Sequence, residues 1–237
     1  MKTQAVLFDK DGTLLDLDKF WIPVAIYAAK SVAGDNADEE ILQKMLESIG
    51  VSNETADVTG TLCCGTNGEI GECFYEVLVK NGINIEKNVV IEKVINAVHN
   101  GASVGVVAPI CENLAATLEK LKNNNIKLAV VTSDDACSTA NCLEKLGIKK
   151  YFDAVYTEGG ELPHKPAPDM LYDFCEKFDV DKECVVMVGD TYTDMNFAKN
   201  AGVRAVGVAK TEKHKEYLMK KTDTVIHDVS YIFDVID

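Results

Sequence analysis

Residues 6–16 read VLFDKDGTLLD, and this stretch decides the fold class. The apolar run from Val6 to Phe8 is short and ends in a turn signal, which predicts a strand buried on both faces. Asp9 and Asp11 stand where that strand ends, at the edge where ligands bind in open α/β sheets. Gly12 lets the backbone turn away there, because glycine adopts angles that other residues avoid. The stretch therefore predicts a site at the end of a buried strand.

Two carboxylates held close together repel each other unless something compensates. One solution is a raised pKa on one of them, and another is a hard cation such as Mg²⁺ with its preference for oxygen ligands. A solvated acidic turn is the plain alternative. An EF-hand calcium loop is excluded, because its twelfth position requires Glu and counting from Asp9 gives Phe20.

The segment DKDGTLLD resembles the first motif of the haloacid dehalogenase-like (HAD) superfamily, most of whose members are Mg²⁺-dependent phosphohydrolases. This resemblance implies that Asp9 is the nucleophile and that Asp11 is the general acid and base. It also implies that Gly12 belongs to the phosphate-binding residues.

Composition fits a soluble globular protein. The chain has 237 residues, with 47% hydrophobic and 26% charged residues. Its net charge of −14 argues against nucleic acid and anionic membrane surfaces as partners. The 8 cysteines show no zinc spacing and are interpreted as reduced, and no signal peptide or membrane span is expected. We therefore expect a cytoplasmic protein, either a monomer or a homodimer.

The chain after the first strand is helical in pattern for about 80 residues. Helices are expected near residues 20–29, 38–49, 69–81 and 88–100, with Pro23 in conflict with the first of them and a loop at 59–68. Such an insert is the pattern of a helical cap. We predict a cap domain at 16–105 and a core domain at 1–15 and 106–237.

The remainder alternates between strands and helices. Strands are predicted at residues 126–131, 153–157, 184–188, 203–208 and 224–226, with helices at 112–125, 136–146, 168–178, 193–201 and 212–220. This alternation predicts a parallel sheet with right-handed crossovers. The fold class is thus α/β, a Rossmann-like doubly wound parallel sheet core with an inserted α-helical cap.

Three further motifs follow in the order that the HAD family shows. Thr132 and Ser133 follow a buried strand, and they either cap the next helix or, by resemblance, bind the phosphoryl group. Lys165, in HKPAPDM, is either a surface lysine or, by resemblance, the cation on the transferring group. Asp190 and Asp194, in GDTYTD, fit a helix start or, by resemblance, the metal site. Asp194 is expected to hold the lysine or a metal-bound water.

The resemblance implies a mechanism. Asp9 attacks phosphorus, Asp11 protonates the leaving oxygen and then activates water, and Mg²⁺ is held by Asp9, the Asp11 carbonyl, Asp190 and Asp194. Mg²⁺ and Lys165 offset all but one of the four carboxylate charges, so we expect activity to need the metal. The substrate is expected to be a small phosphorylated metabolite, with phosphoglycolate-like compounds as one guess.

Competing interpretations remain open. A phosphotransferase of the β-phosphoglucomutase type shares every core motif. A non-enzymatic, aspartate-phosphorylated binding or signalling module is disfavoured by the chain length and the complete catalytic set. His164 is interpreted as a loop histidine, and the segments 59–68 and 19–21 are candidates for specificity.

Overall fold

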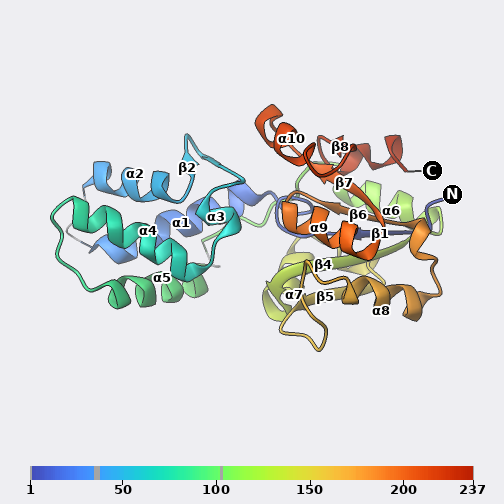
Figure 1. Ribbon diagram of the computed structural model, residues 1–237, viewed down its shortest axis with the longest axis horizontal. Coiled ribbons are helices and arrows are strands. Elements are labelled where there is room, and N and C mark those ends of the chain that lie inside the picture. The colour runs from blue at the N-terminus through green and yellow to red at the C-terminus, as the bar shows by residue number, and fades with distance from the viewer. Residues whose placement is uncertain (1, 35–37, 102–103, 237) are drawn as a thin grey trace. The chain divides into compact units, whose positions relative to one another are not determined.

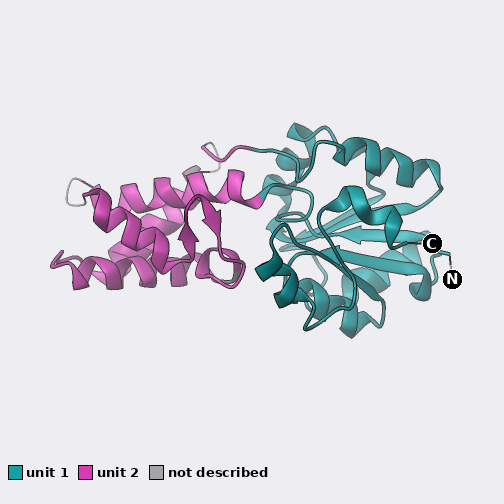
Figure 2. Ribbon diagram, turned by 90° about the horizontal axis from the view of Figure 1, so that it is seen from above, with its two compact units in different colours: residues 1–16, 107–237 teal, residues 17–106 magenta. Residues whose placement is uncertain are grey.

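The computed structural model describes residues 2–34, 38–101 and 104–236 and divides into two compact units. Unit 1 comprises Met1–Asp16 and Val107–Asp237, and unit 2 comprises Leu17–Val106 (Figure 2). These boundaries lie one residue from those expected for the core and the cap. Among the described helices, none is long and apolar enough to cross a membrane.

Unit 1 is built on a six-stranded sheet with the strand order β5-β4-β1-β6-β7-β8 (Figure 1). Every neighbouring pair in this sheet is parallel, which confirms the predicted α/β class. The strands are β1 (Ala5–Phe8), β4 (Lys127–Asp135), β5 (Ala154–Glu158), β6 (Val185–Gly189), β7 (Arg204–Val208) and β8 (Val225–Ile226).

Helices cover both faces of the sheet. Alternate residues of β1 point to opposite faces and pack against different helices. Val6 and Phe8 belong to a core cluster with Leu114, Leu118 and Leu121. Ala5 and Leu7 belong to a second cluster that includes residues of two other helices, among them Phe174 and Phe197. The helices of this unit are α6 (Leu114–Asn123), α7 (Ala136–Lys145), α8 (Asp169–Phe178), α9 (Tyr192–Ala201) and α10 (Glu212–Leu218), with short 3-10 turns η2 (Lys149–Tyr151), η3 (Lys182–Cys184) and η4 (Val229–Asp234).

Unit 2 is mainly helical and has its own hydrophobic core, which includes Ala28, Met45, Phe74, Leu78 and Val94. Its elements are α1 (Leu17–Ala33), α2 (Glu39–Ser48), β2 (Val51–Ser52), β3 (Thr55–Ala56), α3 (Thr61–Cys64), α4 (Asn67–Lys80) and α5 (Lys87–Gly101).

Three local predictions were wrong. The helix expected near residues 20–29 is longer, since α1 begins at Leu17 and ends at Ala33, with Pro23 inside it. The segment expected to be a loop at 59–68 contains the short helix α3 and the start of α4, which Thr66 caps. The strand expected to end at residue 131 continues as β4 to Asp135, with a register shift against β5 after Val131. That shift is a tertiary pairing feature, which periodicity does not reveal.

Candidate active site

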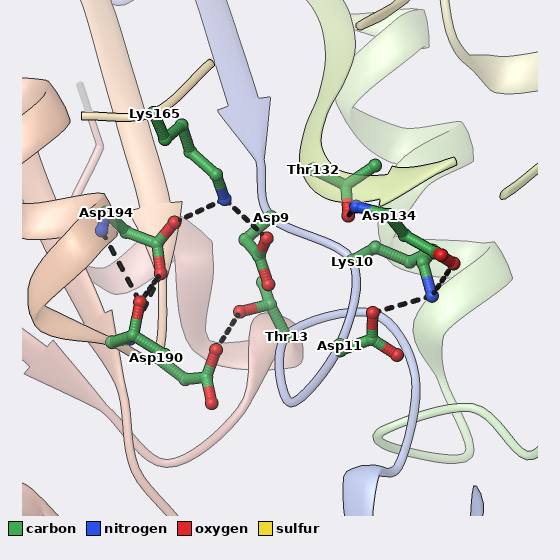
Figure 3. Close-up of polar contacts among 10 residues, drawn as sticks. Asp9, Lys10, Asp11, Thr13, Thr132, Asp134, Lys165, Asp190 and Asp194 are labelled. Atoms are coloured by element: carbon green, nitrogen blue, oxygen red, sulfur yellow. Dashed lines mark hydrogen bonds and ion pairs between the residues drawn. The ribbon is translucent and has the colours of Figure 1, made fainter. Parts of the chain in front are cut away.

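A buried lysine joins two carboxylates at the carboxyl end of β1 (Figure 3). Lys165 Nζ lies 2.6 Å from Asp9 Oδ1 and 2.7 Å from Asp194 Oδ1. Asp9 follows β1, Lys165 lies in the loop between β5 and α8, and Asp194 lies in the first turn of α9. The structure therefore brings together three residues that are separated by 29 and 156 positions.

The first turn of α9 fixes Asp194 by a capping box. Asp194 Oδ2 accepts hydrogen bonds from the backbone N–H of Thr191 at 3.0 Å and from its hydroxyl at 2.6 Å. Its other oxygen remains for Lys165, so a motif that satisfies the helix N-terminus also aims a carboxylate at the lysine. The contact with Lys165 corresponds to one of the two roles considered for Asp194.

Asp190 follows β6, which pairs with β1. Its Oδ1 accepts a hydrogen bond from the Thr13 hydroxyl at 3.4 Å, and its backbone carbonyl accepts one from His214 Nε2 at 2.6 Å. A Cβ on Gly12, whose φ is +78°, would lie 2.1 Å from Asp190 Oδ2. Only glycine therefore fits where the turn after β1 meets Asp190.

Burial and like charge dominate the electrostatics of this cluster. Burial raises the pKa of Asp9 to about 7, against the opposing effect of Lys165 and with help from Asp194 and Asp11. Burial, followed by the charges of Asp9 and Asp194, raises the pKa of Asp190 well above its ordinary value. Burial alone would lower the pKa of Lys165, but Asp194 and Asp9 outweigh it and hold that pKa above its ordinary value.

These residues fit a hard divalent cation. Asp9, Asp190 and Asp194 are all buried and offer carboxylate oxygens that lie within 4.8 Å of one another. Three carboxylates face one lysine, so the cluster has an excess of negative charge that a cation would offset. Oxygen donors of this kind suit Mg²⁺.

Asp11 lies elsewhere in the site. Its carboxylate does not belong to the cluster of three just described, and its Oδ2 lies 2.6 Å from Lys10 Nζ. Figure 3 shows the Asp11 side chain directed to Lys10 and Asp134, while Asp190 and Asp194 lie on the other side of Asp9.

Thr132 and Ser133 lie within β4, at the same edge of the sheet, because Val130 pairs with Phe8. Thr132 is buried and its hydroxyl accepts a hydrogen bond from the backbone N–H of Asp134 at 3.2 Å, whereas Ser133 is exposed. His164 is also exposed. The candidate specificity segments 19–21 and 59–68 belong to unit 2.

Sequence reasoning missed several residues that shape this site, namely Lys10, Thr13, Asp134, Thr191 and His214. A signal existed for Lys10. It lies two residues after a strand predicted to be buried on both faces, so its charge would need a buried counter-ion if the chain stayed in the interior. His214 gave no local signal, since its contact with Asp190 is tertiary.

Comparisons with known proteins identify the family of the chain. The family model described as haloacid dehalogenase-like hydrolase matches residues 6–208. A putative pyrophosphatase PpaX of Caldanaerobacter subterraneus is 27% identical over 238 residues, covering 100% of this chain and 96% of that protein. A phosphoglycolate phosphatase of Neisseria meningitidis is 31% identical over 208 residues, covering 86% of this chain and 80% of that protein.

Solved structures share the fold. A predicted phosphoglycolate phosphatase from Haemophilus somnus superposes with a TM-score of 0.71 at 19% identity, covering 99% of this chain and 98% of that one. A putative β-phosphoglucomutase from Thermotoga maritima gives a TM-score of 0.70 at 23% identity, covering 98% of both chains.

Proposed function

Because the chain belongs to the haloacid dehalogenase-like hydrolase family, we propose that it is a Mg²⁺-dependent phosphatase acting on a small phosphate monoester through an aspartyl-phosphate. The expectation of a family hydrolase of the phosphatase type is confirmed, and the metal, intermediate and substrate class belong to the proposal. The observation that carries it is the Lys165 bridge between Asp9 and Asp194, with Asp190 beside them.

Asp9 is the proposed nucleophile. It lies at the carboxyl end of β1, the edge of the sheet where ligands bind in open α/β folds, and its Oδ1 is held by Lys165. Its attack on phosphorus forms the aspartyl-phosphate and releases the leaving oxygen. Lys165 keeps its charge and stabilises the negative charge that gathers on the phosphoryl oxygens, with Thr132, Ser133 and Gly12 as the further phosphate-binding residues.

Asp11 is the proposed general acid and base. It gives a proton to the leaving oxygen and then takes one from the water that cleaves the aspartyl-phosphate. Mg²⁺, held by Asp9, the Asp11 backbone carbonyl and Asp190 with support from Asp194, would supply charge compensation between the carboxylates and the phosphate dianion. We expect unit 2 to select among leaving groups.

The names of the relatives suggest which substrates to try. One is named a pyrophosphatase and another a phosphoglycolate phosphatase, so pyrophosphate, phosphoglycolate and sugar phosphates form the first panel. The mutase remains an alternative that product analysis separates. A cytoplasmic location and a monomeric or homodimeric state stay predictions.

The test is phosphate release from this panel, with and without Mg²⁺, by the wild type and Asp9→Asn. We expect release that needs Mg²⁺ and falls by about 10³-fold or more in the variant, because the nucleophile is gone. Asp179→Asn is the matched control, since Asp179 is exposed and lies outside the site. Release that Asp9→Asn leaves unchanged would refute the assignment, and an isomerised sugar phosphate without release would indicate a mutase.

A further inference from the structure

Lys10 is a charged side chain in the interior of unit 1, between two carboxylates (Figure 3). Its side chain is 2% exposed, and Nζ lies 2.6 Å from Asp11 Oδ2 and 3.1 Å from Asp134 Oδ2. The two carboxylates come from different segments, the turn after β1 and the end of β4. Neither Lys10 nor Asp134 has a part in the proposed chemistry so far.

An ammonium group this deeply buried is costly unless it is paired, and the two carboxylates provide the pairing. Burial alone would lower the pKa of Lys10, but Asp11 and Asp134 outweigh it and hold that pKa above its ordinary value. Lys10 is therefore a fixed cation beside Asp11.

Asp134 is the anchored member of the group. Its Oδ1 accepts a hydrogen bond from the backbone N–H of Asp135 at 2.9 Å. Its own backbone N–H donates to the Thr132 hydroxyl at 3.2 Å. These contacts tie Asp134 to the same strand end as Thr132, so Lys10 is held from a part of the site that does not depend on Asp11.

Sharing one lysine between two carboxylates has a consequence for Asp11. Lys10 contacts one oxygen of the Asp11 carboxyl group, Oδ2, and so restricts how far that group can rotate. Small movements of Asp11 toward the leaving oxygen leave Lys10 paired with Asp134, so its charge is not left unpaired in the interior. A side chain restricted in this way loses less conformational freedom when the reaction needs it.

We propose that Lys10, anchored by Asp134, is a positioning residue that orients the Asp11 carboxyl group for proton transfer. This inference rests on the proposed function, in which the Asp11 carboxyl gives its proton to the ester oxygen as the O–P bond breaks. The resulting carboxylate then takes a proton from the water that attacks the aspartyl-phosphate, so the proton balance closes over one turnover.

The test uses two substrates that differ in their need for a proton. The leaving group of an alkyl phosphate departs as an alcohol and needs a proton from the general acid. The leaving group of p-nitrophenyl phosphate departs as a stabilised phenolate and needs none. The measured quantity is kcat/KM for each ester, because it reports the steps up to departure of the leaving group and not the later hydrolysis. The readout is the alkyl-to-aryl ratio of these values.

We expect Lys10→Met to lower the alkyl-to-aryl ratio by about ten-fold or more, since general acid catalysis contributes roughly 10²–10⁴-fold and is impaired rather than removed. Asp134→Asn should lower the ratio by less, because Lys10 keeps its contact with Asp11. Lys10→Arg should recover most of the wild-type ratio, because it restores the cation. Lys122→Met, which breaks a 2.6 Å ion pair with Asp153 elsewhere in unit 1, is the control and should keep the ratio within about two-fold.

The proposal is overturned if Lys10→Met leaves the alkyl-to-aryl ratio unchanged, whether its kcat/KM values stay at the wild-type level or fall equally for both esters. If Lys10→Met does not fold, Asp134→Asn and Lys10→Arg decide, and an unchanged ratio in Asp134→Asn overturns the proposal. Failure of the proposed function has a different signature, because wild-type protein with Mg²⁺ would then release phosphate from neither ester.

Discussion

Residues at the carboxyl end of β1 make close contacts that leave little room for change. Lys165 contacts Asp9 and Asp194, and Lys10 contacts Asp11. The turn after β1 passes so close to Asp190 that Gly12 has no room for a side chain. The lysine contacts hold the carboxylates that the proposed chemistry uses, and the missing side chain at Gly12 leaves room for the Asp190 carboxylate. At this scale a single methyl group should be enough to disturb the metal site.

Gly12→Ala tests that expectation. The new Cβ would force Asp190 to move, and the positive φ would add about 1–2 kcal/mol of strain. Gly147→Ala is the matched control, because Gly147 has φ +69° but a methyl group there would meet nothing within 4 Å beyond its chain neighbours. Both variants should lose stability, but only Gly12→Ala should bind Mg²⁺ about ten-fold or more weakly in calorimetric titrations. Equal Mg²⁺ affinities in the two variants would contradict this account of Gly12.

Elements act by converging at one edge of the sheet. β1, the loop after β5 and the β6–α9 turn each supply a charged group, and the parallel order of the strands brings these groups together. α10 adds His214, which donates to the Asp190 carbonyl, and Tyr217, whose ring stacks on Tyr192 at 3.8 Å. The fold of unit 1 therefore assembles the cluster, and its buried carboxylates repel one another.

This repulsion predicts a pH dependence of Mg²⁺ binding. The pKa of Asp9 in the metal-free protein is raised to about 7, so below that pH the metal must displace a proton. Apparent Mg²⁺ affinity should rise by at least about ten-fold per pH unit up to pH about 7, because the metal must displace the Asp9 proton and the pKa of Asp190 is raised as well. Titration calorimetry in buffers of different ionisation enthalpy measures both the affinity and the proton release. An affinity that does not change between pH 6 and 8 would contradict the prediction.

The same shift affects folding stability. Between the ordinary Asp pKa of 3.8 and about 7, Asp9 binds a proton in the folded, metal-free protein but not in the unfolded chain, so its contribution to stability should fall as pH rises through this window. Mg²⁺ should therefore raise the unfolding temperature more at pH 8 than at pH 6. Asp9→Asn should lose part of this difference.

The whole molecule consists of two units with separate hydrophobic cores. The ends of unit 1 that receive the insert lie together, since the Asp16 backbone N–H donates to the Ala108 carbonyl at 2.9 Å and Leu15 forms a bridge with Pro109. All the carboxylates of the metal cluster lie in unit 1. The chemistry and the selection of substrate are therefore expected to be separable.

Replacing residues 17–106 by a short glycine-serine linker tests this separation. The shortened chain should fold, gain stability from Mg²⁺ and hydrolyse p-nitrophenyl phosphate. Its kcat/KM for the best natural substrate should fall by about 100-fold more than for the aryl ester, because contacts that position the leaving group are lost. A shortened chain that folds and keeps the full preference would show that unit 1 alone selects the substrate.

Much of the fold could be predicted from patterns among neighbouring residues in the sequence. Apolar runs followed by Asp9, Thr132 and Asp190 predicted the strands and their carboxyl ends, since strand periodicity and turn chemistry depend on neighbouring residues. A long helical stretch after β1 predicted the insert in the same way. The parallel pairing of the strands then followed from general rules of chain connection, whereas their order came from the structure.

Tertiary structure decided the partners. That Lys165 bridges Asp9 and Asp194, that Lys10 is buried against Asp11 and Asp134, and that β4 extends to Asp135 all depend on segments far apart in the chain. Sequence spacing cannot specify such contacts, because a charge buried by one segment is neutralised by another whose position is set only when the sheet assembles.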